Sequence, residues 1–175
     1  ATLTVNPPAL STLVTSAANV IGGKQIRLTA NLGSVAPSGG TSVALTSTDT
    51  NALPVPASIS IAAGATSGDV LVTSGVVAAD ISVTATATLG AVYKTAGVVV
   101  KAAALSSLVP SRTVLTGGST ISVRVQLDGA APTGGTTVTL SSASSAIVSL
   151  PLQATVPAGA TSVNVDAVSS AVAAD

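Results

Sequence analysis

Several residue types that carry chemistry are absent from this chain of 175 residues. It has no cysteine, histidine, methionine, tryptophan, phenylalanine or glutamate, and its single aromatic residue is Tyr93. Without histidine or cysteine, the chain cannot form a Ser-His-Asp or Cys-His nucleophile, and it offers no imidazole or thiolate to a metal. Paired-carboxylate chemistry would depend on dispersed aspartates alone. The composition therefore argues against an enzyme and against a cofactor.

Charged residues are also scarce, and the two signs balance. Six basic and six acidic residues make up 7% of the chain and give a net charge of zero. Surfaces that bind nucleic acid or anionic membranes need clustered Lys and Arg, which are scattered singly here. The apolar stretch 96–105 is interrupted by Gly97 and Lys101 and is far shorter than the roughly 18 residues that span a bilayer. We predict no nucleic-acid partner and no membrane span.

The residues that are abundant are small and aliphatic. Hydrophobic residues make up 47% of the chain, and because Val, Leu, Ile and Ala recur at regular spacing, the chain is expected to fold. A composition dominated by Ala, Val, Thr, Ser and Gly, with almost nothing oxidisable, suits material that is exported into an uncontrolled medium. We therefore expect a secreted or cell-surface protein.

The sequence contains an internal repeat. When the chain is shifted by about 95 residues, residues 1–80 align with 96–175 without a gap, and roughly two residues in five are identical. Three segments show this most clearly: APSGGT from Ala36 and APTGGT from Ala131, AGATS from Ala63 and Ala158, and VAAD from Val77 and Val172. This pattern is typical of a tandem array of similar domains.

Apolar and polar residues alternate with a period of two, which predicts β-strands. In residues 26–32, Ile26, Leu28, Ala30 and Leu32 would face one way, and Arg27, Thr29 and Asn31 the other. Further strands are predicted at 10–15, 41–48, 58–62, 67–74, 81–89 and 92–101. About seven short strands per repeat, separated by glycine-containing turns, are typical of an immunoglobulin-like antiparallel β-sandwich. We predict an all-β fold of tandem sandwiches of this kind.

The same residues resemble a known group of proteins. TLTVNPPALSTL before a Gly-Gly turn, followed by the A-P-x-G-G-T and P-A-G-A-T-S turns, is similar to the bacterial immunoglobulin-like (Big-type) repeats of large secreted surface or filament proteins. The resemblance covers the whole chain and implies a fold, not an activity. The Trp and disulfide of antibody domains are both absent, so the core must consist of small aliphatic side chains.

The repeat also predicts the domain organisation. We expect residues 1–9 to be the last strand and linker of a preceding repeat, 10–101 to form one repeat, and 102–175 to form a second repeat that lacks its last two strands. Two explanations of these ends stay open. The chain is a part of a longer covalent array, which we favour, or a neighbouring subunit donates a strand, a scheme that leaves the penultimate strand unsupplied.

The lysines and aspartates that could take part in catalysis or metal binding have simpler structural interpretations. A Ser-Lys dyad would need Lys24, Lys94 or Lys101, but serines are so common here that proximity would mean little. Oxygen ligands for calcium could come only from aspartates, and we interpret these as turn-capping residues: Asp49, Asp69, Asp80, Asp128, Asp166 and Asp175. Asp80 and Asp175 alone occupy equivalent positions. We therefore predict no catalytic, cofactor-binding or metal-binding residue.

Two further features are interpreted in the same way. The Gly-Gly pairs that begin at Gly22, Gly39, Gly117 and Gly134 lack the helix and lysine of a phosphate loop, and we expect hairpin turns. Tyr93 cannot form an aromatic platform for sugars alone, and we expect it on a strand surface or between domains.

These observations lead to a functional hypothesis. We expect a structural repeat module of an extracellular filament, stalk or adhesin, whose partners are further repeats or copies of itself, associated head to tail and laterally. The alternative is a ligand-binding or spacer module of a secreted multidomain protein. In a binding module, specificity would be expected in loops that differ between the copies, 48–55 and 143–150.

Overall fold

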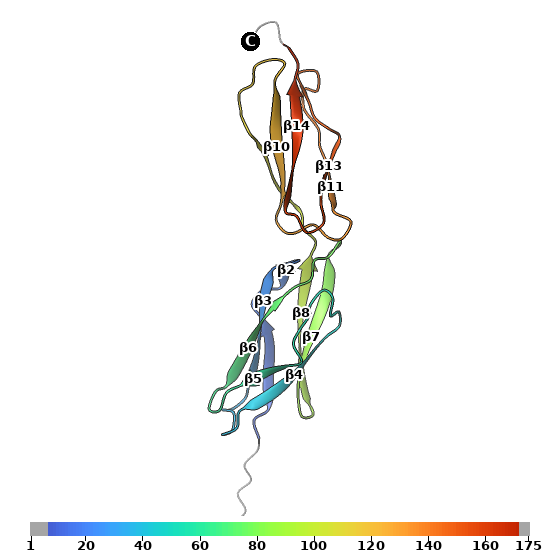
Figure 1. The fold of residues 1–175 in the computed structure, drawn as a ribbon. Helices are drawn as coiled ribbons and strands as arrows, with labels where there is room; N and C mark the ends of the chain where they lie inside the picture. The colour runs from blue at the N-terminus through green and yellow to red at the C-terminus, as the bar shows by residue number, and fades with distance from the viewer. Residues whose placement is uncertain (1–6, 172–175) are drawn as a thin grey trace, which may run out of the picture. The chain divides into compact units, whose positions relative to one another are not determined.

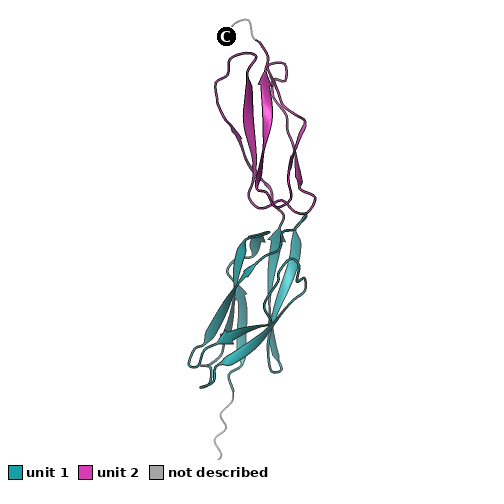
Figure 2. Cartoon of the chain, viewed as in Figure 1, with its two compact units in different colours: residues 1–101 teal, residues 102–175 magenta. Residues whose placement is uncertain are grey.

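The computed structural model describes residues 7–171, so the expectations for residues 1–6 and 172–175 lie outside it. The described chain consists of strands and connecting turns, without a helix, which confirms the all-β prediction. It forms two compact units, residues 1–101 and 102–175, shown in two colours in Figure 2. The repeat boundaries expected from the sequence remain a prediction, and each unit is described by itself below.

Unit 1 contains two sheets (Figure 1). The first has the strand order β1-β3-β6 and the second the order β2-β8-β7-β4-β5. The strands are β1 (Leu10–Thr15), β2 (Asn19–Ile21), β3 (Gln25–Leu32), β4 (Thr41–Ser47), β5 (Ser58–Ile61), β6 (Ser67–Thr73), β7 (Ile81–Leu89) and β8 (Val92–Lys101). The chain changes sheet at most of its connections, as it does in an immunoglobulin-like sandwich.

The core of unit 1 lies between these two sheets. On β3, the residues predicted to face inward are buried, and Leu28 and Ala30 have no exposed surface. From the opposite sheet, Val83 and Val100 are at most 1% exposed. Because the alternation of each strand places one set of side chains between the sheets, aliphatic burial stabilises the sandwich without any aromatic residue.

The structure of unit 1 adds one strand to those expected and corrects one expectation about its turns. It has an additional strand, β2, which pairs with β8 in parallel, with Asn19 opposite Val99 and Ile21 opposite Lys101. The pair Gly22-Gly23 is therefore not a hairpin turn, because it connects β2 in one sheet with β3 in the other. The same holds for Gly39-Gly40 between β3 and β4. The tight hairpin of unit 1 is the β7–β8 connection, where Gly90 has a φ of 59°.

Unit 2 also contains two sheets, a larger one of order β12-β14-β10-β9 and a smaller one of order β11-β13. Its strands are β9 (Leu105–Pro110), β10 (Thr120–Leu127), β11 (Thr136–Thr139), β12 (Val148–Ser149), β13 (Gln153–Val156) and β14 (Ser162–Ser169). Its core is smaller and centres on Val125 and Val156, which have no exposed surface.

The internal repeat is visible in the strand boundaries. After a shift of about 95 residues, β1 coincides with β9, β3 with β10, and β5 with β13, while β6 and β14 begin at equivalent residues. Turn geometry repeats as well. The Gly40 N–H donates to the Pro37 carbonyl at 2.8 Å, and the Gly135 N–H donates to the Pro132 carbonyl at 2.8 Å. Similar sequences therefore produce equivalent strands and turns in both units.

Candidate functional site

Two of the aspartates hold backbone turns. A carboxylate oxygen of Asp49 accepts hydrogen bonds from the backbone N–H groups of Asn51 (2.9 Å) and Ala52 (3.0 Å). A carboxylate oxygen of Asp128 accepts the N–H of Ala104 at 2.8 Å, next to the start of β9. These are the roles that aspartate commonly has in turns, where it satisfies backbone donors that no strand pairs.

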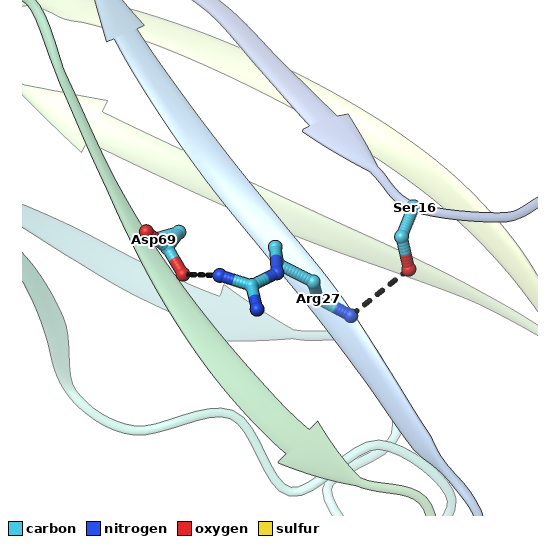
Figure 3. A network of polar contacts seen from close by, with 3 residues as sticks. All are labelled: Ser16, Arg27 and Asp69. Atoms are coloured by element: carbon cyan, nitrogen blue, oxygen red, sulfur yellow. Dashed lines mark hydrogen bonds and ion pairs between the residues drawn. The ribbon is translucent and has the colours of Figure 1, made fainter.

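A third aspartate belongs to a polar network on the outer face of the β1-β3-β6 sheet (Figure 3). The guanidinium of Arg27 on β3 forms an ion pair with Asp69 on β6, and the backbone N–H of Arg27 donates to the Ser16 hydroxyl at 3.1 Å. Both charged side chains are about half exposed, 50% and 45%. A pair so well solvated contributes little to stability.

Asp80 forms an ion pair as well. Its carboxylate lies 2.8 Å from the ammonium nitrogen of Lys101, so the residue that precedes β7 is joined to the residue that ends β8. Lys101 was a candidate for a Ser-Lys dyad, and its ammonium group is engaged by this carboxylate. Asp175, the equivalent of Asp80, lies outside the described residues.

The remaining candidates are dispersed over the surface. Lys24 is exposed in the turn between β2 and β3, and Lys94 is exposed on β8 opposite Ala87. Asp166 lies on β14 opposite Ser122. Within residues 7–171, no three potential ligands of the His, Cys, Asp or Glu type come together. The structure thus brings the candidate residues into pairs and turns, not into one site.

One polar feature was missed by sequence reasoning. Ser74 is only 3% exposed, and its hydroxyl donates to the carbonyl oxygens of Lys24 (3.0 Å) and Ile21 (3.2 Å). In unit 2, Ser169 is 5% exposed, and its hydroxyl contacts the carbonyl oxygens of Thr116 and Ser119, both at 3.0 Å.

The signal for this feature is present in the repeat, because both serines occupy equivalent positions at the end of equivalent strands. Because serine is frequent throughout the chain, the presence of two serines at equivalent positions did not by itself indicate a buried hydroxyl. The buried hydroxyls fix the Gly-Gly turns to the core, which is a structural role.

Two hollows lie on unit 1. One, of about 490 Å³, is lined by the Gly39-Gly40 turn and by residues 60–63. The other, of about 420 Å³, is formed mainly by apolar groups, among them Pro7, Pro37, Leu89 and Val92. Neither lining contains a charged residue or an aromatic ring. The polar side chains of the first hollow are the hydroxyls of Ser38, Thr41, Ser42 and Ser60.

The features proposed for ligand binding have structural positions. Tyr93 is 68% exposed on β8, opposite Thr88, so it lies on a strand surface. In the loop 48–55, Ala52 and Leu53 are at most 1% exposed, because this loop packs into the core of unit 1. Their side chains are therefore not available to a ligand. Residues 7–171 include no helix that is long and apolar enough to cross a membrane.

Comparisons with known proteins do not identify a family for this chain. No protein family and no curated protein matches the sequence. Among solved structures, a mutant of Salmonella alpha-2-macroglobulin is similar at 12% identity with a TM-score of 0.34, over 93% of this chain and 14% of that chain. The same protein reacted with methylamine is similar at 13% identity with a TM-score of 0.32, again over 93% and 14%. The chain thus spans a small part of the structures that it matches.

Proposed function

We propose that the chain is a structural repeat module of a secreted or cell-surface filament, stalk or adhesin, with no catalytic activity and no cofactor. The observation that carries this proposal is the repetition of one β-sandwich plan, down to its turn hydrogen bonds, in two consecutive units. Arrays of similar domains provide length and transmit tension, because each domain folds around a core of its own.

The chemistry of the described residues supports the same proposal. Four of the five described aspartates are engaged in turns, as with Asp49 and Asp128, or in exposed ion pairs, as with Asp69 and Asp80. The sequence supplies no histidine, cysteine or glutamate to replace them. The repeated sandwich plan and its A-P-x-G-G-T turns favour bacterial immunoglobulin-like repeats as the relatives of this chain.

Lateral association is part of the proposal. On the outer face of the β1-β3-β6 sheet, Val14 on β1 is 46% exposed and Leu71 on β6 is 52% exposed. Edge strands with few charged residues are able to pair with other chains, and aliphatic side chains on an outer face add apolar contact area. We therefore propose that copies of the chain associate side by side. Sedimentation of the purified chain over a dilution series would show only monomers if this is wrong.

The main proposal is tested on the cells that produce the protein. Antibodies raised against the purified chain are bound to intact cells and viewed by electron microscopy with gold labels. A filament or stalk predicts gold aligned along thin fibres that project from the cell surface. Gold found only after the cells are broken would contradict a surface structure, and gold spread evenly over the envelope without fibres would favour the spacer or ligand-binding alternative.

A further inference from the structure

A short parallel strand pair joins the early and the last parts of unit 1. β2 pairs with the end of β8, with Asn19 opposite Val99 and Ile21 opposite Lys101. Every other strand pair within residues 7–171 is antiparallel. β2 follows directly after β1, whereas β8 ends on the last residue of the unit. The parallel pair therefore connects two segments that are about 80 residues apart in sequence.

Backbone hydrogen bonds extend this pair at both of its ends. The N–H of Val99 donates to the Ala18 carbonyl oxygen at 2.9 Å, just before β2 begins. The N–H of Gly22 donates to the Lys101 carbonyl oxygen at 2.9 Å, just after β2 ends. The bonded contact between the two segments is therefore longer than the three residues of β2.

Further contacts fasten the pair where the chain leaves β8. The hydroxyl of the buried Ser74 contacts the Ile21 carbonyl oxygen at 3.2 Å, and the N–H of Gly23 donates to the Ser74 carbonyl oxygen at 3.0 Å. On the other strand, the ammonium group of Lys101 forms its 2.8 Å ion pair with Asp80. Both segments are thus attached to the rest of unit 1 at the same place.

The polarity of this pair determines how it responds to tension along the chain. In the text below, the terminal pair means residues 18–22 together with 99–101. Tension from the N-terminal side reaches β2 at Asn19, and tension from the C-terminal side reaches β8 at Lys101, and because the strands are parallel these are opposite ends of the terminal pair. The strands are then pulled past each other, so that all bonds between them are loaded together. In the antiparallel β7–β8 hairpin, tension at the open end would load the bonds one after another.

We propose that the terminal pair is the force-bearing element of unit 1, which resists unfolding while the chain is under tension. This inference rests on the proposed function, because a filament or stalk is the setting in which the chain is stretched. Bonds that must break together raise the barrier to forced unfolding, and this barrier, not equilibrium stability, governs the force at which a domain opens. The core around Leu28 supplies equilibrium stability, but it does not lie between the two points at which tension enters.

The test pulls the terminal pair in two directions in a single-molecule force experiment. Because the chain has no cysteine, handles can be attached to introduced cysteines alone. Ala17→Cys with Ala104→Cys loads the pair from opposite ends, whereas Ala17→Cys with Thr95→Cys loads it from one end, and all three residues are exposed. We expect the force at the first rupture to be at least about twofold higher when the pair is loaded from opposite ends.

A substitution within the terminal pair provides a second readout. Val99→Pro removes the N–H that donates to Ala18, and should lower the rupture force by at least about one third when the pair is loaded from opposite ends. The comparison variant is Leu28→Ala, which removes a fully buried side chain from β3, outside the terminal pair. It should lower equilibrium stability strongly, and yet lower the rupture force less than Val99→Pro does.

Two results would overturn the inference. Equal rupture forces in the two directions would mean that the parallel arrangement gives no resistance of its own. A rupture force that Leu28→Ala lowers more than Val99→Pro would mean that the core, and not the terminal pair, resists tension. If Val99→Pro does not fold, the two pulling directions decide alone. Neither measurement bears on gold labelling of cells, so failure of this inference can be told apart from failure of the proposed function.

Discussion

At the scale of single residues, the sandwich depends on glycines at positions that no side chain can occupy. Gly40 has a φ of 74°, and a Cβ atom built on it would lie 2.8 Å from the Ile61 carbonyl oxygen. We predict that Gly40→Ala lowers the free energy of unfolding of unit 1 by about 1–3 kcal/mol. The neighbouring substitution Gly39→Ala is the control, because a Cβ there has nothing within 4 Å. Equal losses for both variants in urea unfolding would contradict this account.

The buried serines lead to a second prediction at this scale. Ser74→Ala removes the hydroxyl that is hydrogen-bonded to the carbonyl oxygens of Ile21 and Lys24, so these buried oxygens lose one hydrogen-bond donor. We expect a loss of about 1–3 kcal/mol in the free energy of unfolding of unit 1. Ser169→Ala should have a similar effect on unit 2, and the exposed Ser38→Ala almost none. If Ser74→Ala and Ser38→Ala are equally neutral in urea titrations, the serine does not anchor the turn.

At the scale of elements, β3 shows how one strand divides its residues between the core and solvent. Leu28 has no exposed surface, whereas the adjacent Arg27 forms a half-exposed ion pair with Asp69. Leu28→Ala should therefore cost about 2–5 kcal/mol of stability, and Arg27→Gln no more than about 1 kcal/mol. Chemical unfolding of both variants measures this difference. A loss for Arg27→Gln as large as that for Leu28→Ala would mean that the ion pair is a main support of the sheet.

The same strand shows what the sequence could predict. Period-two alternation is a local property, so the inward residues of β3 and the boundaries of most strands followed directly from it. β2 has three residues and is too short to alternate, and it forms through its partner β8, about 80 residues away in sequence. Partners on neighbouring strands, such as Arg27 on β3 and Asp69 on β6, depend on which strands become neighbours, and the pattern of a single segment does not contain that information.

At the scale of the whole molecule, the unequal cores of the two units determine how the chain should unfold. In unit 1 both sheets contribute fully buried side chains, such as Leu28 and Val83, whereas in unit 2 the two-stranded sheet covers a smaller core around Val125 and Val156. Since buried apolar area is the main favourable term in folding, unit 1 should be the more stable unit. When the chain is destabilised, unit 2 is therefore expected to unfold before unit 1.

This difference predicts two transitions in scanning calorimetry. Because each unit has a core of its own, the two units should unfold separately. Unit 2, with the smaller core, should unfold first and unit 1 at a higher temperature. Leu28→Ala should lower only the upper transition, by about 10 °C or more, and Val125→Ala should lower only the lower one, because each side chain is fully buried in one unit. A single transition that both substitutions shift would mean that the units unfold together, so that stability in the array is shared between neighbours instead of belonging to each repeat.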